Sequence, residues 1–169
     1  MQADTLQKLE DAYEQFPGMC AKGVSQSEID QAASQLGLPF PPDYQEFLRR
    51  YGGGHAGSLP VAGLRQWEFA GCTDWSVIEL TGYFRKRQYP GANRWVIFSG
   101  DGSANPIGFD DVGHIWVSDH DSCEFVCIET SFEDWIRRWA LRVEPHRSGY
   151  IAQERWPDEI LQRLRRGAV

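Results

Sequence analysis

Two histidines and two cysteines lie within 14 residues of one another in the second half of the chain, and these residue types bind zinc. They are His114, His120, Cys123 and Cys127. Structural zinc sites place paired ligands at C-x₂₋₄-C and H-x₃₋₅-H spacing, with tight turns between them. Cys123 and Cys127 instead fall four residues apart in a stretch of strand composition, so both side chains would share one face as small buried residues. The pattern favours core cysteines and turn histidines, and we expect no bound metal.

A glycine-rich turn and a nearby serine are the next candidates for chemistry. Residues 100–103 (Gly-Asp-Gly-Ser) could present successive backbone N–H groups to a phosphate. The lysine of a GxxxxGK[ST] loop is missing, however, and strand-like sequence on both sides indicates a hairpin turn. Ser99 would need the context G-x-S-x-G to act as the nucleophile of a hydrolase, but Ile97 and Phe98 precede it. We therefore expect no catalytic residue and no cofactor.

Carboxylates are concentrated in the same part of the chain. Calcium would use such oxygens, but no D-x-[DN]-x-[DN]-G-x₅-E loop is present. A hydrolase with paired carboxylates would need a set separation between them, and no separate nucleophile or base stands out. The two main interpretations are a solvated acidic surface, and a patch rimmed by Trp95 and Trp116 that docks a cationic protein. The candidate partner-binding residues are Asp101, Asp110, Asp111, Trp116, Asp119, Asp121 and Glu124, and Glu129 extends the acidic stretch.

The overall charge favours a protein partner over a nucleic acid. The 169 residues have a formal net charge of −7. Residues 1–131 hold 9 Lys or Arg against 18 Asp or Glu, and residues 132–169 hold 8 against 6. An acidic surface repels a phosphate backbone, whereas it speeds the encounter with a basic protein. No apolar run reaches the ~20 residues that span a bilayer, and the first residues lack the order of a secretory signal. We therefore expect a cytoplasmic protein without a membrane partner.

Helical signals occupy the first third of the chain. Apolar residues at three- and four-residue spacing predict an amphipathic helix over residues 4–16. Ser25 and Glu28 form a capping-box pattern that begins a second helix, and Gly37 ends it. Residues 42–51 begin with proline and carry an apolar stripe, so they predict a third helix. Seven tryptophans in one small domain indicate an aromatic-rich core or a recognition surface.

Strand signals dominate the second half. Four strand-length segments, separated by Gly- and Asp-rich turns, span residues 94–99, 105–110, 113–119 and 123–129. Their short connections predict an antiparallel β-meander. Thr130 and Glu133 suggest a capping box for an amphipathic helix that ends at Pro145, and another short helix is expected from Pro157. We predict a single α+β domain in which the meander packs against N-terminal helices and a C-terminal helix.

The stretches between these signals are less regular. Residues 52–60 indicate a flexible turn, and residues 61–64 are a plausible edge strand. Residues 65–93 give no clear pattern and could form strands or a short helix.

Two parts of the chain carry motifs of a known protein family. In the first part a helix ending in Leu-Gly is followed by Leu-Pro, Tyr-x-x-Phe-Leu and a glycine pair: Leu36-Gly37, Leu38-Pro39, Tyr44, Phe47-Leu48 and Gly52-Gly53. In the second part the matching segments are Val96-Ile97-Phe98, Gly100-Asp101-Gly102, Phe109-Asp110, Ile115-Trp116-Val117 with Asp119-His120, and Ser131 to Ile136. This order resembles the Smi/Knr family of the SUKH superfamily. The family often has Asn where this chain has Gly52, and both residues accept positive φ. The resemblance covers residues 25–140 of one domain over residues 1–169, and residues 145–169 form a C-terminal extension.

The resemblance implies a binding protein rather than an enzyme. Bacterial members of the superfamily look like immunity proteins, which bind and neutralise polymorphic toxins, often nucleases, and eukaryotic relatives serve as regulatory scaffolds. The implied partner is a basic toxin domain. Two alternatives stay open: a regulatory or scaffolding module without a toxin partner, and a small metal-assisted hydrolase that uses His114, His120 and nearby carboxylates.

Overall fold

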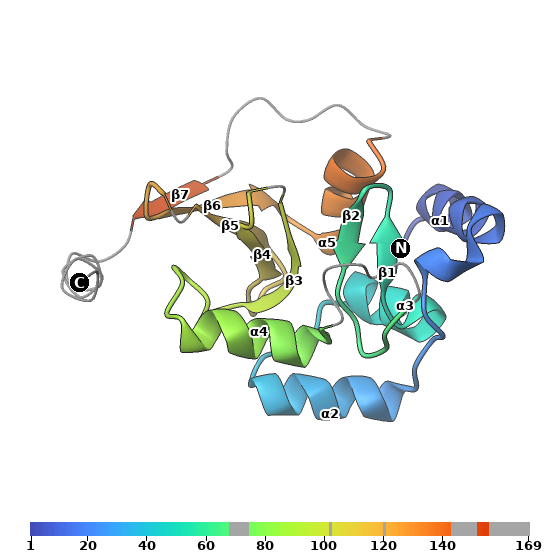
Figure 1. Ribbon diagram of the computed structural model, residues 1–169, viewed down its shortest axis with the longest axis horizontal. Helices are drawn as coiled ribbons and strands as arrows, with labels where there is room; N and C mark the ends of the chain where they lie inside the picture. Colours follow the sequence, from blue (N-terminus) through green and yellow to red (C-terminus); the bar gives the residue numbers. More distant parts are fainter. Residues whose placement is uncertain (68–74, 102, 120, 143–151, 156–169) are drawn as a thin grey trace.

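The computed structural model describes residues 1–67, 75–101, 103–119, 121–142 and 152–155 of the chain (Figure 1). Its helical elements are α1 (Ala3–Gln15), the 3₁₀ turn η1 (Pro17–Met19), α2 (Gln26–Leu36), α3 (Pro42–Tyr51), α4 (Val77–Lys86), α5 (Phe132–Trp135) and the π-helical turn η2 (Ile136–Ala140). Its strands are β1 (Gly54–Ala56), β2 (Leu59–Val61), β3 (Val96–Gly100), β4 (Pro106–Phe109), β5 (Ile115–Asp119), β6 (Glu124–Glu129) and β7 (Ala152–Arg155). The predicted α+β architecture is confirmed.

The three helices predicted in the first third form close to their expected bounds. At the start of α2, Ser25 Oγ accepts a bond from the Glu28 N–H, and Glu28 Oε2 accepts one from the Ser25 N–H, at 3.4 and 3.0 Å. Gly37 ends α2 in the left-handed region, at φ +74°, a conformation that costs glycine little. Helix α3 begins with Pro42, where a missing N–H leaves no unmade bond.

The second half forms the predicted meander. Strands β3, β4, β5 and β6 pair antiparallel in chain order. Strand β7 then pairs antiparallel with β6 and completes a five-stranded sheet. This fifth strand was not predicted, and the helix expected from Pro157 lies outside the described residues.

Aromatic side chains form the core between α3, α5 and one face of the sheet. The Tyr44 ring lies 5.9 Å from Phe98, 5.1 Å from Phe109 and 5.1 Å from Phe132, measured between centroids. The Tyr44 hydroxyl is buried and donates to the carbonyl of Ala62 at 2.6 Å. Its burial raises the pKa of the phenol well above its ordinary value. Tyr44 therefore joins helix, sheet and the segment after β2 in one packed unit.

The opposite face of the sheet is closed by a second aromatic group. Trp116 alternates with Ile115 along β5, so the two side chains lie on opposite faces. The Trp116 ring stacks on Trp95 at 5.8 Å and lies 5.8 Å from Phe125. Trp95 is fully buried. The interpretation of the tryptophans as core residues is correct at these positions.

A β-hairpin replaces the flexible turn and edge strand expected over residues 52–64. Strands β1 and β2 pair antiparallel, with Gly57 at the tip. Gly57 has φ +56°, and a Cβ there would lie 2.2 Å from the carbonyl oxygen of Ala140, so the tip packs directly on the end of η2. Beyond β2, the Ala62 N–H donates to the carbonyl of Phe98 at 2.7 Å. The hairpin is therefore fixed to both η2 and the edge of β3.

The helix after β6 begins one residue later than predicted. Ser131, not Thr130, is the N-cap: its hydroxyl accepts a bond from the Asp134 N–H at 3.0 Å. Glu133 does not complete a capping box, because its Oε1 accepts bonds from the Gln2 N–H at 2.6 Å and from Thr5 Oγ1 at 2.9 Å. The carboxylate that would have capped α5 instead ties it to α1. The prediction that the helix runs on to Pro145 is wrong: its last turn, η2, ends at Ala140, and Arg142 lies in the left-handed region at φ +55°.

Candidate functional site

The meander divides the predicted partner-binding residues between its two ends. In an antiparallel meander, alternate turns lie at opposite ends of the sheet. The β3–β4 and β5–β6 turns share one end, and the β4–β5 turn, with Asp110 and Asp111, lies at the other. The first end, which we call the acidic end, carries the predicted residues Asp101, Asp119, Asp121 and Glu124.

Asp110 and Trp116 stabilise the β4–β5 turn through hydrogen bonds to the Asp110 carboxylate. Asp110 Oδ1 accepts bonds from the N–H groups of Val112 and His114, at 3.1 and 2.8 Å. Asp110 Oδ2 accepts the indole N–H of Trp116 at 2.9 Å. Only 6% of Trp116 is exposed. The expectation that Trp116 and Trp95 form an exposed rim is therefore wrong, because their rings stack on each other and on Phe125.

Carboxylates at the acidic end also hold turns. Asp101 Oδ1 accepts bonds from the N–H groups of Ser103 and Asn105, at 2.8 and 2.9 Å. Asp101 Oδ2 accepts the side-chain amide of Asn105 at 3.0 Å. Asp119 Oδ1 accepts the Asp121 N–H at 2.8 Å. Short acidic side chains bond backbone N–H groups two residues ahead in this way, so each fixes a turn and places negative charge at the same end of the sheet.

Glu129 does not belong to an acidic surface. It is 1% exposed, and its carboxylate accepts bonds from Arg138 Nη1 at 2.6 Å and from the Trp139 indole N–H at 3.2 Å. A buried carboxylate needs such partners. Asp111, by contrast, is exposed beside the exposed Val112 at the other end of the sheet.

The zinc candidates are not assembled into a site in the described part of the chain. Cys123 lies in the β5–β6 turn at φ +57° and is half-buried, so the expectation that it shares a strand face with Cys127 is wrong. Cys127 is buried in β6 as expected. His114 lies on the opposite turn, with Nδ1 3.7 Å from Asp110 Oδ2, and His120 lies outside the described residues. Among the described residues, no group of three or more His, Cys, Asp or Glu could hold a metal ion.

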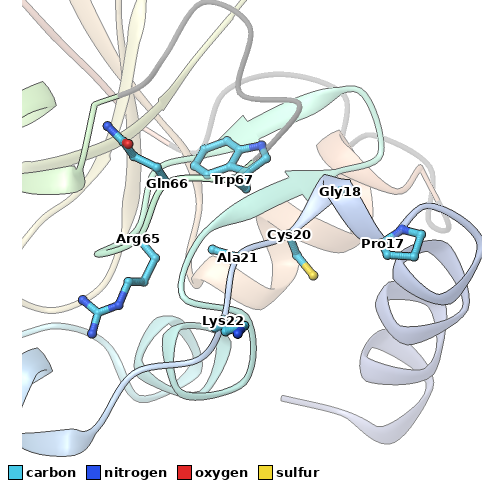
Figure 2. A pocket seen from close by; sticks show the side chains of 8 residues that line it. All are labelled: Pro17, Gly18, Cys20, Ala21, Lys22, Arg65, Gln66 and Trp67. Atoms are coloured by element: carbon cyan, nitrogen blue, oxygen red, sulfur yellow. The ribbon is translucent and has the colours of Figure 1, made fainter.

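A pocket of about 580 Å³ between η1 and the segment after the hairpin contains a cysteine, which makes it a candidate reactive site (Figure 2). It holds Cys20, and the Cys20 sulfur points away from the Trp67 ring in Figure 2. Burial raises the pKa of the Cys20 thiol, the opposite of what a thiolate nucleophile needs.

The neighbouring histidine gives no general base for that thiol. His55 Nδ1 accepts the Trp67 indole N–H at 3.0 Å, and burial lowers the pKa of His55. The Arg65 guanidinium forms an ion pair with Glu28. Among the described residues around the pocket there are therefore groups of catalytic type but no nucleophile–base pair.

Comparison with known protein families gives a match over most of the chain. The family described as "SMI1 / KNR4 family (SUKH-1)" matches residues 23–138. The chain belongs to this family. The match begins just before α2 and ends within η2, so α1 and β7 of this SUKH-1 protein lie outside it. No curated protein matches the sequence.

Family membership is consistent with an immunity-type protein, and SUKH proteins are generally non-enzymatic. None of the described helices of the SUKH-1 chain is long and apolar enough to cross a membrane.

Helix α4 forms within residues 65–93, for which both strands and a short helix were left open, and aromatic residues surround it. Trp75 directly precedes the helix, and Tyr83 lies on it. The overlooked signal was Ser76 with Glu79, a second capping box: Ser76 Oγ accepts the Glu79 N–H, and Glu79 Oε2 accepts the Ser76 N–H, at 3.3 and 2.8 Å. Helix α4 lines a groove that reaches Asp101 of the acidic end.

Proposed function

We propose that this SUKH-1 protein is a cytoplasmic immunity protein that binds a cognate toxin and neutralises it without catalysis. The observation that carries the proposal is the family match over residues 23–138. The pocket chemistry supports it, because the Cys20 thiol has a raised pKa and His55 is engaged with Trp67.

The acidic end is the surface that we propose for the toxin. Asp101 and Asp121 lie in two turns at this end of the sheet, and Asp119 and Glu124 lie on the strand ends that flank the second turn. The whole chain is acidic, with a net charge of −7. A toxin that acts on nucleic acid, such as a nuclease, needs a basic cleft to hold phosphates. Carboxylates that occupy such a cleft would both speed the encounter and exclude the substrate.

A pull-down tests this proposal. The tagged chain is used as bait for the product of the adjacent gene and for proteins of its native host. We expect a one-to-one complex that weakens as salt rises, since salt screens exposed charges. A double change of Asp119→Asn and Asp121→Asn should weaken it further, whereas Asp111→Asn, at the opposite end of the sheet, should not.

Two results would overturn the proposal. If no protein binds and the neighbouring gene encodes no toxin, the neutralising role is wrong. If a partner binds but keeps its full activity, the chain is a regulatory or scaffolding module instead.

A further inference from the structure

An apolar groove runs beside the acidic end, between the β1–β2 hairpin, α4 and β3, and β3 contacts both α4 and β2 (Figure 1). Its volume is about 570 Å³, within the range of about 300–1,000 Å³ typical of ligand pockets. Leu59 and Pro60 form one wall, and Leu80 and Phe84 form the other. Asp101 lies in its lining, so the groove includes a carboxylate of the acidic end.

An exposed tryptophan stands at the α4 side of the groove. Trp75 is 40% exposed, and among the described residues only Phe16 and Val112 are other large apolar side chains with comparable exposure. Its ring lies 4.6 Å from the Tyr83 ring, and the Arg87 guanidinium lies 3.6 Å above Tyr83. Trp, Tyr and Arg are the residues most enriched at binding hot spots. Because these side chains already contact one another, little rotamer entropy remains to be lost on binding.

The backbone edge of β3 beside the groove is already bonded. The Ile97 N–H donates to Thr81 Oγ1 at 2.9 Å, and Thr81 Oγ1 donates to the Ile97 carbonyl at 3.2 Å. The Phe98 carbonyl accepts the Ala62 N–H. A partner therefore cannot add a strand at Ile97 and Phe98, and side-chain insertion is the mode of binding left to this groove.

Asp101 retains capacity for one more donor. A carboxylate offers about four lone-pair sites, and Asp101 uses two on Oδ1 and one on Oδ2 in its own turn. The remaining site on Oδ2 suits a Lys or Arg, because a charged donor gives the stronger bond to a carboxylate. A groove with apolar walls and this carboxylate in its lining suits an apolar group followed by a cation.

We propose that the groove binds an extended segment of the partner, with an aromatic or aliphatic side chain on Trp75 and a neighbouring Lys or Arg at Asp101. The proposal rests on the proposed function, because it specifies how a basic protein partner would be held. It predicts a sequence preference that can be measured without knowing the partner.

The test is a selection from a phage-displayed library of random peptides on the full chain. We expect enriched peptides to carry Lys or Arg within two positions of Trp, Phe, Leu or Ile. Trp75→Ala should weaken a synthetic enriched peptide about 30-fold, as for a hot-spot residue. Asp101→Asn should weaken it about two- to fivefold and flatten its salt dependence.

Matched controls come from the opposite end of the sheet. Val112→Ala removes an exposed apolar side chain and Asp111→Asn an exposed charge, and neither should change the affinity. In the unsubstituted chain, the methyl NMR signals of Leu59 and Leu80 should shift on titration with the peptide, whereas those of Val112 should not. This measurement needs no variant and so does not depend on the folding of one.

Several results would overturn the inference: no enriched peptide family, an acidic consensus, peptides that bind the Trp75→Ala variant equally well, or dimerisation of the chain through Trp75. Its failure is distinguishable from that of the proposed function. If a toxin binds the Trp75→Ala variant with unchanged affinity, the proposed neutralisation stands, but the groove is not the binding site. If the selected peptides bind the chain and lose affinity for the Trp75→Ala variant, but no toxin binds, the groove proposal stands and the proposed neutralisation is wrong.

Discussion

Glu129 and Arg138 form an ion pair that is almost entirely buried, since their side chains are 1% and 12% exposed. Removing one partner leaves an uncompensated charge in the interior, which costs far more than the pair itself contributes. We predict that Arg138→Met lowers the free energy of unfolding by about 3 kcal/mol. Urea denaturation measures this loss. The double variant Glu129→Leu, Arg138→Met should recover most of it, and a loss in the single variant no larger than in the double variant would contradict the prediction.

Glu28 gives the chain a pH dependence that can be assigned to one residue. The Ser25 N–H, then Arg65 and the Ser25 hydroxyl, lower the pKa of Glu28 from 4.5 to about 2. A carboxyl whose folded-state pKa is lowered stabilises the fold above pH 4.5 and loses this contribution as the pH falls to about 2. Melting temperatures between pH 5 and 2 should therefore fall less steeply for Glu28→Gln than for the unsubstituted chain. Equal slopes would mean that Glu28 is not held in this way.

Thr130 and Ser131 are adjacent, and each has a hydroxyl that could cap the start of α5. Ser131 caps the helix, whereas the Thr130 hydroxyl bonds the Asp134 side chain at 3.2 Å. An N-cap stabilises a helix by about 1 kcal/mol. We expect Ser131→Ala to lower the free energy of unfolding by about 1 kcal/mol, and Thr130→Ala by clearly less, in parallel denaturant titrations. The opposite ranking would place the cap at Thr130.

Sequence patterns that span a few residues correctly predicted the helices whose ends are fixed by hydrogen bonds between neighbouring residues. The α2 capping box, Gly37 and the apolar stripe of α3 are each read over a few neighbouring residues, and all of them formed as expected. The β1–β2 hairpin was not predicted because its strands have three residues each and contain glycine and proline. Contacts distant in sequence hold it, at Ala140 and Phe98. Strand β7 likewise depends on pairing with β6, which no pattern within residues 152–155 reveals.

For the molecule as a whole, the order of the strands in the sheet limited how much of the candidate site could be predicted. The sequence placed Asp101, Asp111 and Asp121 in turns correctly, since Asp with Gly or Ser marks turns. Spacing along the chain did not reveal that Asp110 and Asp111 lie at the far end of the sheet from Asp101 and Asp119. The sequence also did not reveal that Trp116 is buried, because its burial depends on stacking against Trp95, which is distant in the chain.

We propose that this chain neutralises a toxin by binding to it. The most direct measurement is a titration of the adjacent gene's product, assayed for its own activity, with increasing amounts of the chain. We expect that the toxin's activity falls linearly and reaches zero at one equivalent of the chain, and that the Asp119→Asn, Asp121→Asn variant is needed in clear excess for the same inhibition. Full activity in the presence of excess chain, with the complex shown to form, would contradict it.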